Sequence, residues 1–330
     1  RGDRVRRRDL LVMLGGAAIA APAGSRADQR SLPVVGFLNP RSPGTGESVV
    51  AAFRRGLNEA GFSEGTSVLV EYRWGLDQPE RLPALAQDLV RRKVDVIVAG
   101  ATTSARSAKA ATSEIPIVFT TAVDPIRLGL VASLSRPGGN VTGATFYSSV
   151  LVAKQMELLH ELVPTAKTAA LLVNPAAATA EPSTKDATAA ARAIGLDLRV
   201  LKATSEIELE SAFAALAKSG ADALLVTVDP FFDSRPKTLS DLASRSSMPT
   251  VYYVREFVQA GGLISYGASL TDAYRQAGLY AGRILRGEKP GDLPVVQPTI
   301  FDLTINLRTA RSLGLMIAPS ILARADEVIE

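Results

Sequence analysis

The sequence contains no cysteine and one histidine, and only 5% of its 330 residues are aromatic. The lack of cysteine excludes disulfide bonds, thiolate chemistry and cysteine-ligated metals. His160 lies in the helix-like segment "MELLHELV", and no convincing Ser-His-Asp set can be built around it. GxSxG, HExxH and Walker motifs are missing, and "PGTGES" at 43–48 lacks both the GxGxxG spacing and a P-loop lysine. We therefore expect no enzyme, no cofactor and no metal.

Long apolar runs are also missing after residue 27, and the first 27 residues have a distinct pattern. A basic start precedes an apolar, small-residue run over 10–23, and Ser-Arg-Ala at the end suits signal peptidase. That run spans about 14 residues and is broken by glycine and proline, whereas a bilayer needs about 20. "RRDLL" at 7–11 fits a twin-arginine signal. We predict an export signal at 1–27 and a periplasmic protein.

The excess of positive charge belongs to this first segment. It holds six arginines and two aspartates, so residues 28–330 carry 31 basic and 31 acidic side chains. A nucleic-acid-binding protein needs a basic surface, and no basic stripe remains after this subtraction. We therefore expect no nucleic-acid partner.

Short apolar runs alternate with longer runs of helical period from residue 32 onward. Continuous Val/Ile runs such as "VDVIVAG" are typical of strands buried on both faces of a parallel sheet, and strict alternation of strands with helices favours a doubly wound α/β fold. We predict strands at 34–39, 67–73, 94–99, 116–121 and 141–146, and helices at 47–60, 79–92, 103–112 and 125–134.

The same pattern begins again after a helix at 151–162. "AALLVNP" at 169–175 repeats "VVGFLNP" at 34–40, and both apolar runs stop at Asn-Pro. We predict strands at 168–173, 197–202, 222–228, 249–254, 263–267 and 297–305, and helices at 183–194, 206–218, 238–245, 271–286, 306–313 and 319–328. The chain is thus expected to form two Rossmann-like lobes, residues 32–148 with about 268–292 and residues 149–267 with about 293–330. Three crossings between lobes would form a multi-strand hinge.

Polar residues at the ends of the predicted strands are the candidate ligand-binding residues, because doubly wound sheets bind ligands beyond the carboxyl ends of their strands. In the first lobe these are Asn39, Thr102, Thr103, Ser104, Thr121 and Asp124. In the second lobe they are Asn174, Asp229, Tyr253, Glu256 and Tyr266.

Each candidate has a structural alternative. Asn before Pro can bind an amide or zwitterionic ligand, but it is also a turn signal. The hydroxyls at 102–104 can meet a carboxylate or cap a helix. Asp124 and Asp229 each precede proline, so either can pair with an ammonium group or cap a helix. "VYYVREF" at 251–257 can offer a ring and a carboxylate, or pack as a strand and start a helix.

Longer segments resemble a known family. "VVGFLNPRSPGTGESVVAAFRRGLNEAGF", "IPIVFTTAVDPIRLGLVASLSRPGGNVTG", "ALLVTVDPFF", "REFVQAGGLISYGASLTDAYRQAG", "GRILRGEKP" and "LARADEVIE" are similar to segments of the ATP-binding-cassette (ABC) transporter substrate-binding proteins whose best-known members bind aromatic amino acids. The similarity runs from about residue 32 to 330.

The resemblance implies a type I periplasmic binding-protein fold, in which two lobes close on a small molecule and present it to a membrane permease. It implies a pocket lined from the strand ends of both lobes, an amino acid or related carboxylate as ligand, and, by our expectation, a monomer. Two alternatives stay open: a ligand sensor for a membrane signalling partner, and a hydrolase on the same fold with Asp124 or Asp229 as base.

Overall fold

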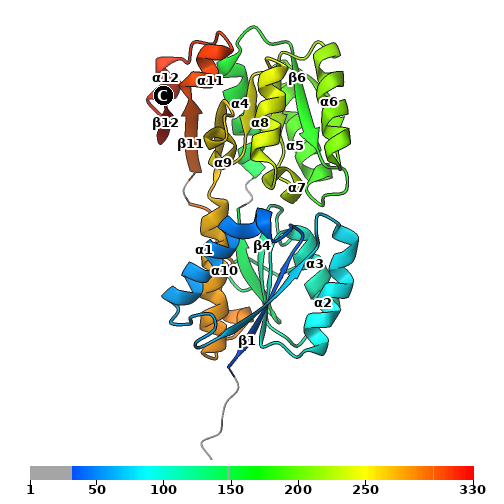
Figure 1. Cartoon of the computed structure of the whole chain (residues 1–330), viewed down its shortest axis with the longest axis vertical. Helices are drawn as coiled ribbons and strands as arrows, with labels where there is room; N and C mark the ends of the chain where they lie inside the picture. The colour runs from blue at the N-terminus through cyan, green and yellow to red at the C-terminus, as the bar shows by residue number, and fades with distance from the viewer. Residues whose placement is uncertain (1–31, 147–148, 300) are drawn as a thin grey trace, which may run out of the picture. The chain divides into compact units, whose positions relative to one another are not determined.

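The computed structural model describes residues 32–146, 149–299 and 301–330, and the predicted export signal lies outside them. Residues Pro33–Glu330 form one compact unit, built on two sheets (Figure 1). The first sheet has the strand order β2-β1-β3-β4-β5 and is parallel throughout. Its strands are β1 (Val34–Asn39), β2 (Leu69–Trp74), β3 (Val96–Ala99), β4 (Ile117–Thr121) and β5 (Val141–Thr145).

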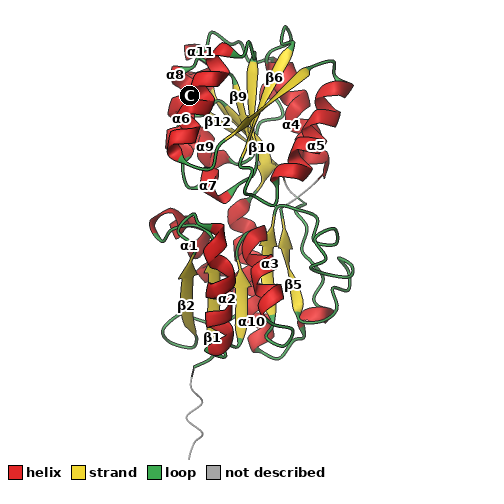
Figure 2. Ribbon diagram, turned by 90° about the vertical axis from the view of Figure 1, so that its right-hand side faces the viewer, coloured by secondary structure: helices red, strands yellow, loops and turns green. Residues whose placement is uncertain are grey.

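Helices cover both faces of the first sheet. One face is covered by α2 (Leu82–Arg91) and α3 (Thr102–Ala111) (Figure 2). Leu89 of α2 and Ala105 of α3 belong to one hydrophobic cluster with residues of β1, β3 and β4. The other face is covered by α1 (Glu47–Glu59) and by α10 (Leu270–Leu285), which comes from far along the chain. The 3-10 turns η1 (Gly44–Gly46) and η2 (Pro79–Arg81) precede α1 and α2. The predicted helix at 125–134 is wrong: this segment forms turns, with Asp124 bonded to the backbone N–H of Ile126. We call this sheet with its four helices the first lobe.

The second sheet has the order β12-β11-β10-β9-β8-β6-β7. Its strands are β6 (Thr168–Val173), β7 (Asp197–Lys202), β8 (Ala223–Val226), β9 (Thr250–Tyr252), β10 (Ile264–Ala268), β11 (Phe301–Asn306) and β12 (Glu327–Ile329). All pairs are parallel except β10–β11. The predicted helix at 319–328 is wrong in its second half, because residues 327–329 pair with β11 as a strand.

Helices also cover both faces of the second sheet. One face carries α4 (Ser149–Leu162), α5 (Ala180–Ala193), α11 (Leu307–Ser312) and α12 (Pro319–Leu322). The other face carries α6 (Glu206–Lys218), α7 (Pro230–Asp233), α8 (Pro236–Arg245) and α9 (Arg255–Gln259). Separately, a 3-10 turn η3 (Pro290–Asp292) follows α10 of the first lobe. We call this sheet with its eight helices the second lobe. None of the helices in the described part of the chain is long and apolar enough to cross a membrane.

The two sheets share one strand order. Read from its edge, the second sheet runs β7-β6-β8-β9-β10, which matches β2-β1-β3-β4-β5 position by position. Asn39 ends β1 and Asn174 follows β6, so the repeated Asn-Pro marks the same point of both sheets. From β1 the chain continues to β2 on one side and then to β3 on the other, and β6 is flanked by β7 and β8 in the same way. The position between β1 and β3, and that between β6 and β8, is the switch point of each sheet, where such sheets bind ligands. The predicted doubly wound α/β fold is confirmed.

Glycines let α1 and α10 approach closely. A Cβ on Gly56 would lie 1.8 Å from the carbonyl oxygen of Arg275, and one on Gly278 would lie 2.1 Å from that of Phe53. The two helix backbones are therefore in direct contact, which places Tyr274 of α10 beneath the end of β1. This packing brings a residue from late in the sequence to the switch point of the first sheet.

Candidate functional site: a pocket at both switch points

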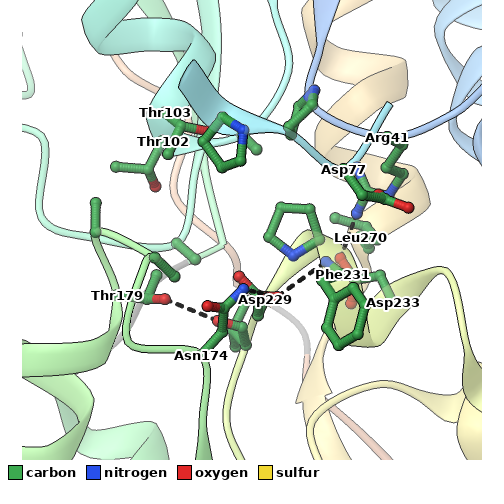
Figure 3. Close-up of a pocket in the computed structure, with 18 of the residues that line it drawn as sticks. Arg41, Asp77, Thr102, Thr103, Asn174, Thr179, Asp229, Phe231, Asp233 and Leu270 are labelled. Atoms are coloured by element: carbon green, nitrogen blue, oxygen red, sulfur yellow. Dashed lines mark hydrogen bonds and ion pairs between the residues drawn. The ribbon is translucent and has the colours of Figure 1, made fainter. Parts of the chain in front are cut away.

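A pocket lies where the switch points of the two sheets face each other (Figure 3). The first lobe contributes polar side chains from the loops after β1, β2 and β3, namely Arg41, Asp77, Thr102 and Thr103. The second contributes Asn174 after β6, and Asp229 and Asp233 after β8. Phe146, Phe231 and Tyr274 supply aromatic surface. The pocket thus combines charged, hydrogen-bonding and aromatic groups from both lobes, the composition expected of a small-molecule site.

The two Asn side chains form the same local structure. The Oδ1 atom of Asn39 accepts from the N–H of Arg41 (3.1 Å), and that of Asn174 accepts from the N–H of Ala176 (3.0 Å). Each is an Asx turn, which fixes the chain direction after the strand. Asn39 then donates to the Tyr274 hydroxyl (2.9 Å), whereas Asn174 donates to Asp229 (3.0 Å). Asn39 is fully buried behind the pocket, while Asn174 lines it.

Asp229 is a buried carboxylate that faces the pocket. It caps α7 by accepting from the N–H of Phe231 (2.9 Å), and its side chain also accepts from the amide of Asn174. Among the described residues, no Lys or Arg forms an ion pair with it. Burial raises the pKa of Asp229 to about 6; the Asn174 hydrogen bond opposes this shift, and the charge of Asp233 adds to it. Asp229 therefore lacks a cation that a ligand could supply.

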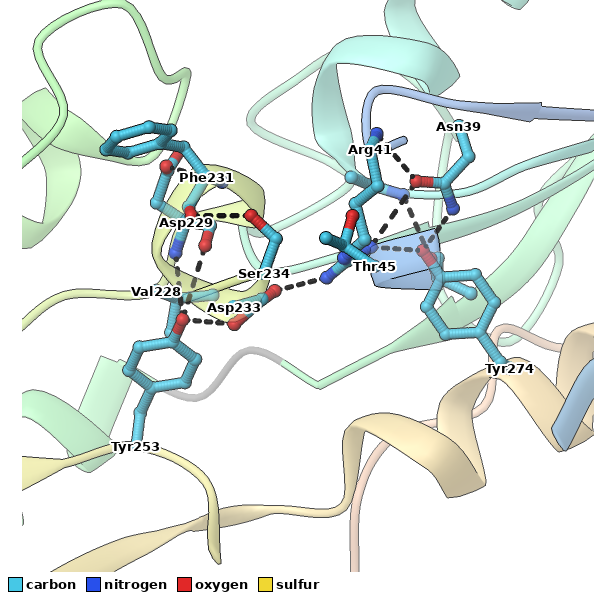
Figure 4. A network of polar contacts seen from close by, with 12 residues as sticks. Asn39, Arg41, Thr45, Val228, Asp229, Phe231, Asp233, Ser234, Tyr253 and Tyr274 are labelled. Carbon is cyan, nitrogen blue, oxygen red and sulfur yellow. Dashed lines mark hydrogen bonds and ion pairs between the residues drawn. The ribbon is translucent and has the colours of Figure 1, made fainter. Parts of the chain in front are cut away.

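Arg41 and Asp233 form a buried ion pair across the pocket (Figure 4). Arg41 also donates to the Tyr274 hydroxyl (3.0 Å), and the Tyr253 hydroxyl donates to Asp233. Burial acts to lower the pKa of Arg41, but its electrostatic interactions with Tyr274 and Asp233 outweigh burial, so the pKa is raised and the guanidinium stays charged. Burial raises the pKa of Asp233, and the charge of Arg41 opposes that shift. The pair is neutral as a unit.

The start of α3 offers hydrogen-bond donors to the pocket. Ala101, Thr102 and Thr103 line the pocket, and the residue at the N-cap of this helix makes no side-chain cap hydrogen bond to the first-turn N–H groups. Thr121 holds Thr102 through a contact between their hydroxyls (2.8 Å). Ala101, just before the helix, has φ 71° and ψ 159°, a conformation that is strained for any residue but glycine. A strained backbone at a helix start that lines a pocket suits an anionic group of a ligand.

The sequence candidates fall into three groups. Thr102, Thr103, Asn174 and Asp229 line the pocket. Asn39, Thr121 and Tyr253 lie behind it and hold lining residues in place. The others lie elsewhere: Ser104 is fully buried, Asp124 caps a turn, Glu256 is in the first turn of α9, and Tyr266 stacks on Phe301 beside a different pocket.

Sequence reasoning missed several lining residues, among them Arg41, Asp77, Thr179, Asp233 and Tyr274. Arg41 and Asp233 each follow a predicted strand end by a few residues, so a wider window around Asn39-Pro40 and Asp229-Pro230 would have included them. Tyr274 reaches the site only because α10 packs on α1. No local pattern indicates that contact.

The fold and the pocket define a two-lobed solute-binding protein. The model of the family "ABC transporter substrate binding protein" matches residues 42–329, and the chain belongs to this family. Its class of function is therefore substrate binding for an ABC transporter.

Individual relatives agree with this assignment. The chain is 27% identical over 263 residues to the tyrosine-binding protein of Clostridioides difficile (strain R20291), covering 80% of this chain and 75% of that one. The crystal structure of a conserved domain protein from Vibrio cholerae matches with a TM-score of 0.83 and 28% identity, covering 90% and 100% of the two chains. The ABC domain from Streptococcus pneumonia in complex with L-Trp matches with a TM-score of 0.82 and 27% identity, covering 91% and 100%. The predicted family and type I periplasmic binding-protein fold are confirmed.

Proposed function

We propose that this protein captures an aromatic amino acid in the periplasm and delivers it to the permease of an ABC importer. The pocket between the two lobes is the observation that carries the proposal, because it contains an unpaired buried carboxylate, uncapped helix N–H groups and aromatic rings. Relatives described as binding tyrosine and L-Trp support the aromatic class. Export of the folded protein by the twin-arginine route is part of the proposal and rests on residues 1–27.

The chemistry of the pocket gives the ligand an orientation. The ammonium group pairs with Asp229, which has no protein cation. The carboxylate accepts hydrogen bonds at the start of α3, from backbone N–H groups and from Thr103. The ring packs against Phe231 and Phe146, where stacked or edge-on aromatic contacts contribute beyond burial alone. Each end of the ligand thus contacts a different lobe, so binding favours the closed arrangement.

A ligand panel tests the proposal. The protein is unfolded and refolded to remove bound solute, then titrated in a calorimeter with tryptophan, tyrosine, phenylalanine, leucine and benzoate. We expect tight 1:1 binding of at least one aromatic amino acid and recovery of that amino acid chemically unchanged. Binding of benzoate in preference to every amino acid would contradict the ligand class, and mass spectrometry of the solute that co-purifies would then identify the replacement.

Binding should depend on pH through Asp229. Its carboxyl must lose a proton before it can pair with the ligand ammonium, and its pKa in the ligand-free site is raised to about 6. Affinity should therefore be constant above pH 7 and fall as pH drops through 6, reaching about tenfold weaker binding at pH 5 than at pH 7. Calorimetry at pH 5, 6, 7 and 8 measures this, and the Asp229→Asn variant should lose the dependence. Affinity that stays flat in the unaltered protein would show that Asp229 does not meet the ammonium group.

A further inference from the structure

Arg41 is the residue that a simple interpretation would assign to the ligand carboxylate, because it is a cation that lines the pocket. Its contacts indicate otherwise. One guanidinium nitrogen donates to Tyr274 and, at 3.4 Å, to Asn39, both in the first lobe. The second donates to Asp233 of the second lobe. Only 2% of Arg41 is exposed. Because the guanidinium is paired with Asp233, its charge is already neutralised before a ligand arrives.

Both carboxylate oxygens of Asp233, the partner of Arg41, also accept hydrogen bonds within the protein. Its side chain is 5% exposed, and the Tyr253 hydroxyl holds its other oxygen. The contacts therefore form one continuous chain, from Asn39 and Tyr274 through Arg41 to Asp233 and Tyr253 (Figure 4). Each end is anchored in a different lobe, and the Arg41–Asp233 step is the one that joins them.

A second ion pair joins the lobes at the rim of the pocket. Asp77, in the loop after β2, accepts from Arg235, just after α7, at 3.2 Å. The Arg235 guanidinium also lies 4.1 Å from the ring centre of Phe231. Both ion pairs thus reach the same short segment of the second lobe, residues 229–235, which also presents Asp229 and Phe231 to the pocket.

We propose that Arg41 and Asp233 are closure residues: their ion pair, with Asp77–Arg235 beside it, stabilises the closed arrangement of the lobes and leaves the ligand carboxylate to the start of α3. This inference rests on the proposed function for its ligand. Neither pair can form when the lobes separate, so both favour only the closed state. The apparent dissociation constant equals the intrinsic one divided by the closed fraction. Weakening the pairs must therefore weaken every ligand by the same factor, whatever groups the ligand carries.

The test compares three indole ligands on matched variants. L-tryptophan carries both charged groups, tryptamine lacks the carboxylate, and indole-3-propionate lacks the ammonium. For Arg41→Gln and for Asp233→Asn we expect all three to bind about tenfold or more weakly, by a common factor, and the double variant to recover part of the loss. Lys237→Gln serves as control, because it removes a charge from the exposed Lys237–Asp241 pair of α8 and should change nothing.

Other outcomes would overturn the inference. If Arg41→Gln weakens tryptophan and indole-3-propionate but leaves tryptamine unchanged, Arg41 binds the carboxylate. If Asp233→Asn has no effect, the ion pair does not govern closure. Asp77→Asn provides a second variant away from the buried cluster, with the same common factor expected, and thermal melts show that each variant is folded.

A ligand-free measurement separates this inference from the proposed function. Small-angle X-ray scattering of the unliganded protein should give a smaller radius of gyration for the unaltered chain than for Arg41→Gln. If none of the three ligands binds the unaltered protein, the ligand class is wrong, yet the scattering comparison still decides the closure role. Equal radii for the two proteins would overturn it.

Discussion

Replacing Asp229 by asparagine should weaken the binding of an aromatic amino acid by about 100-fold, or roughly 3 kcal/mol, the cost of removing one partner of a buried charge pair. Asparagine keeps the oxygen that caps α7 and the contact with Asn174, so the shape of the site is preserved and only the charge is lost. Calorimetric titration of both proteins at pH 7.5 measures the difference.

The chain contains its own control for this substitution. Asp124-Pro125 is a second Asp-Pro junction, after β4 of the first lobe, and its carboxylate accepts from the N–H of Ile126 without lining the pocket. Asp124→Asn should leave affinity within about twofold of the unaltered value, since it is a surface change outside the site. Equal losses of affinity in the two variants would indicate a general effect on folding. Unchanged affinity in Asp229→Asn would show that Asp229 does not bind the ammonium group.

Replacing Gly56 by alanine should destabilise the protein by about 2 kcal/mol. The added Cβ would lie 1.8 Å from the backbone carbonyl of Arg275, so α1 and α10 must move apart. Overpacking of this kind costs about 1–3 kcal/mol or more, and the better helix propensity of alanine offsets about 1 kcal/mol of it. For a protein of this size the melting temperature should fall by about 3 °C.

Gly44→Ala is the matched control for Gly56→Ala. A Cβ at Gly44 has no atom within 4 Å, so its melting temperature should stay unchanged. The separation of the helices should also shift Tyr274 away from Asn39 and Arg41, so Gly56→Ala should weaken ligand binding as well. An unchanged melting temperature in Gly56→Ala would show that α1 and α10 do not pack backbone to backbone.

The fold was largely predictable because its strands are continuous apolar runs and its helices are periodic. The strands predicted at 168–173 and 197–202 match β6 and β7 residue for residue. Errors arose where periodicity was weak or tertiary pairing decided the outcome. Residues 125–134 have apolar spacing that suggests a helix, but Gly129 adopts a positive φ (64°) and the segment forms turns. Residues 327–329 form a strand only because β11 offers a free edge.

The site was predictable only where it coincides with strand ends. Thr102, Asn174 and Asp229 follow the ends of β3, β6 and β8 within three residues. Because doubly wound sheets bind ligands beyond the carboxyl ends of their strands, these residues could be placed in the pocket from sequence. Tyr266 was also a candidate, because it lies near the end of the strand predicted at 263–267. In the structure its side chain lies on the face of β10 that packs against Phe301. Side-chain direction along a strand alternates, and a one-residue difference in register reverses it.

The residues that link the lobes could not be inferred from local sequence. The Arg41–Asp233 contact joins residues 192 positions apart, and the Arg41–Tyr274 contact joins residues 233 positions apart. Both depend on how α7 and α10 are held by the rest of the fold. Charge counting would not have found the pair, because the chain has many arginines and aspartates with the same local surroundings.

A crystal structure of the protein with its co-purified solute tests the central claim most directly. The solute should lie between the lobes, with a cationic group on Asp229, an anionic group at the start of α3 beside Thr103, and an aromatic ring against Phe231. Electron density for the solute in the pocket beside Tyr266 and Phe301, or in contact with one lobe alone, would contradict it.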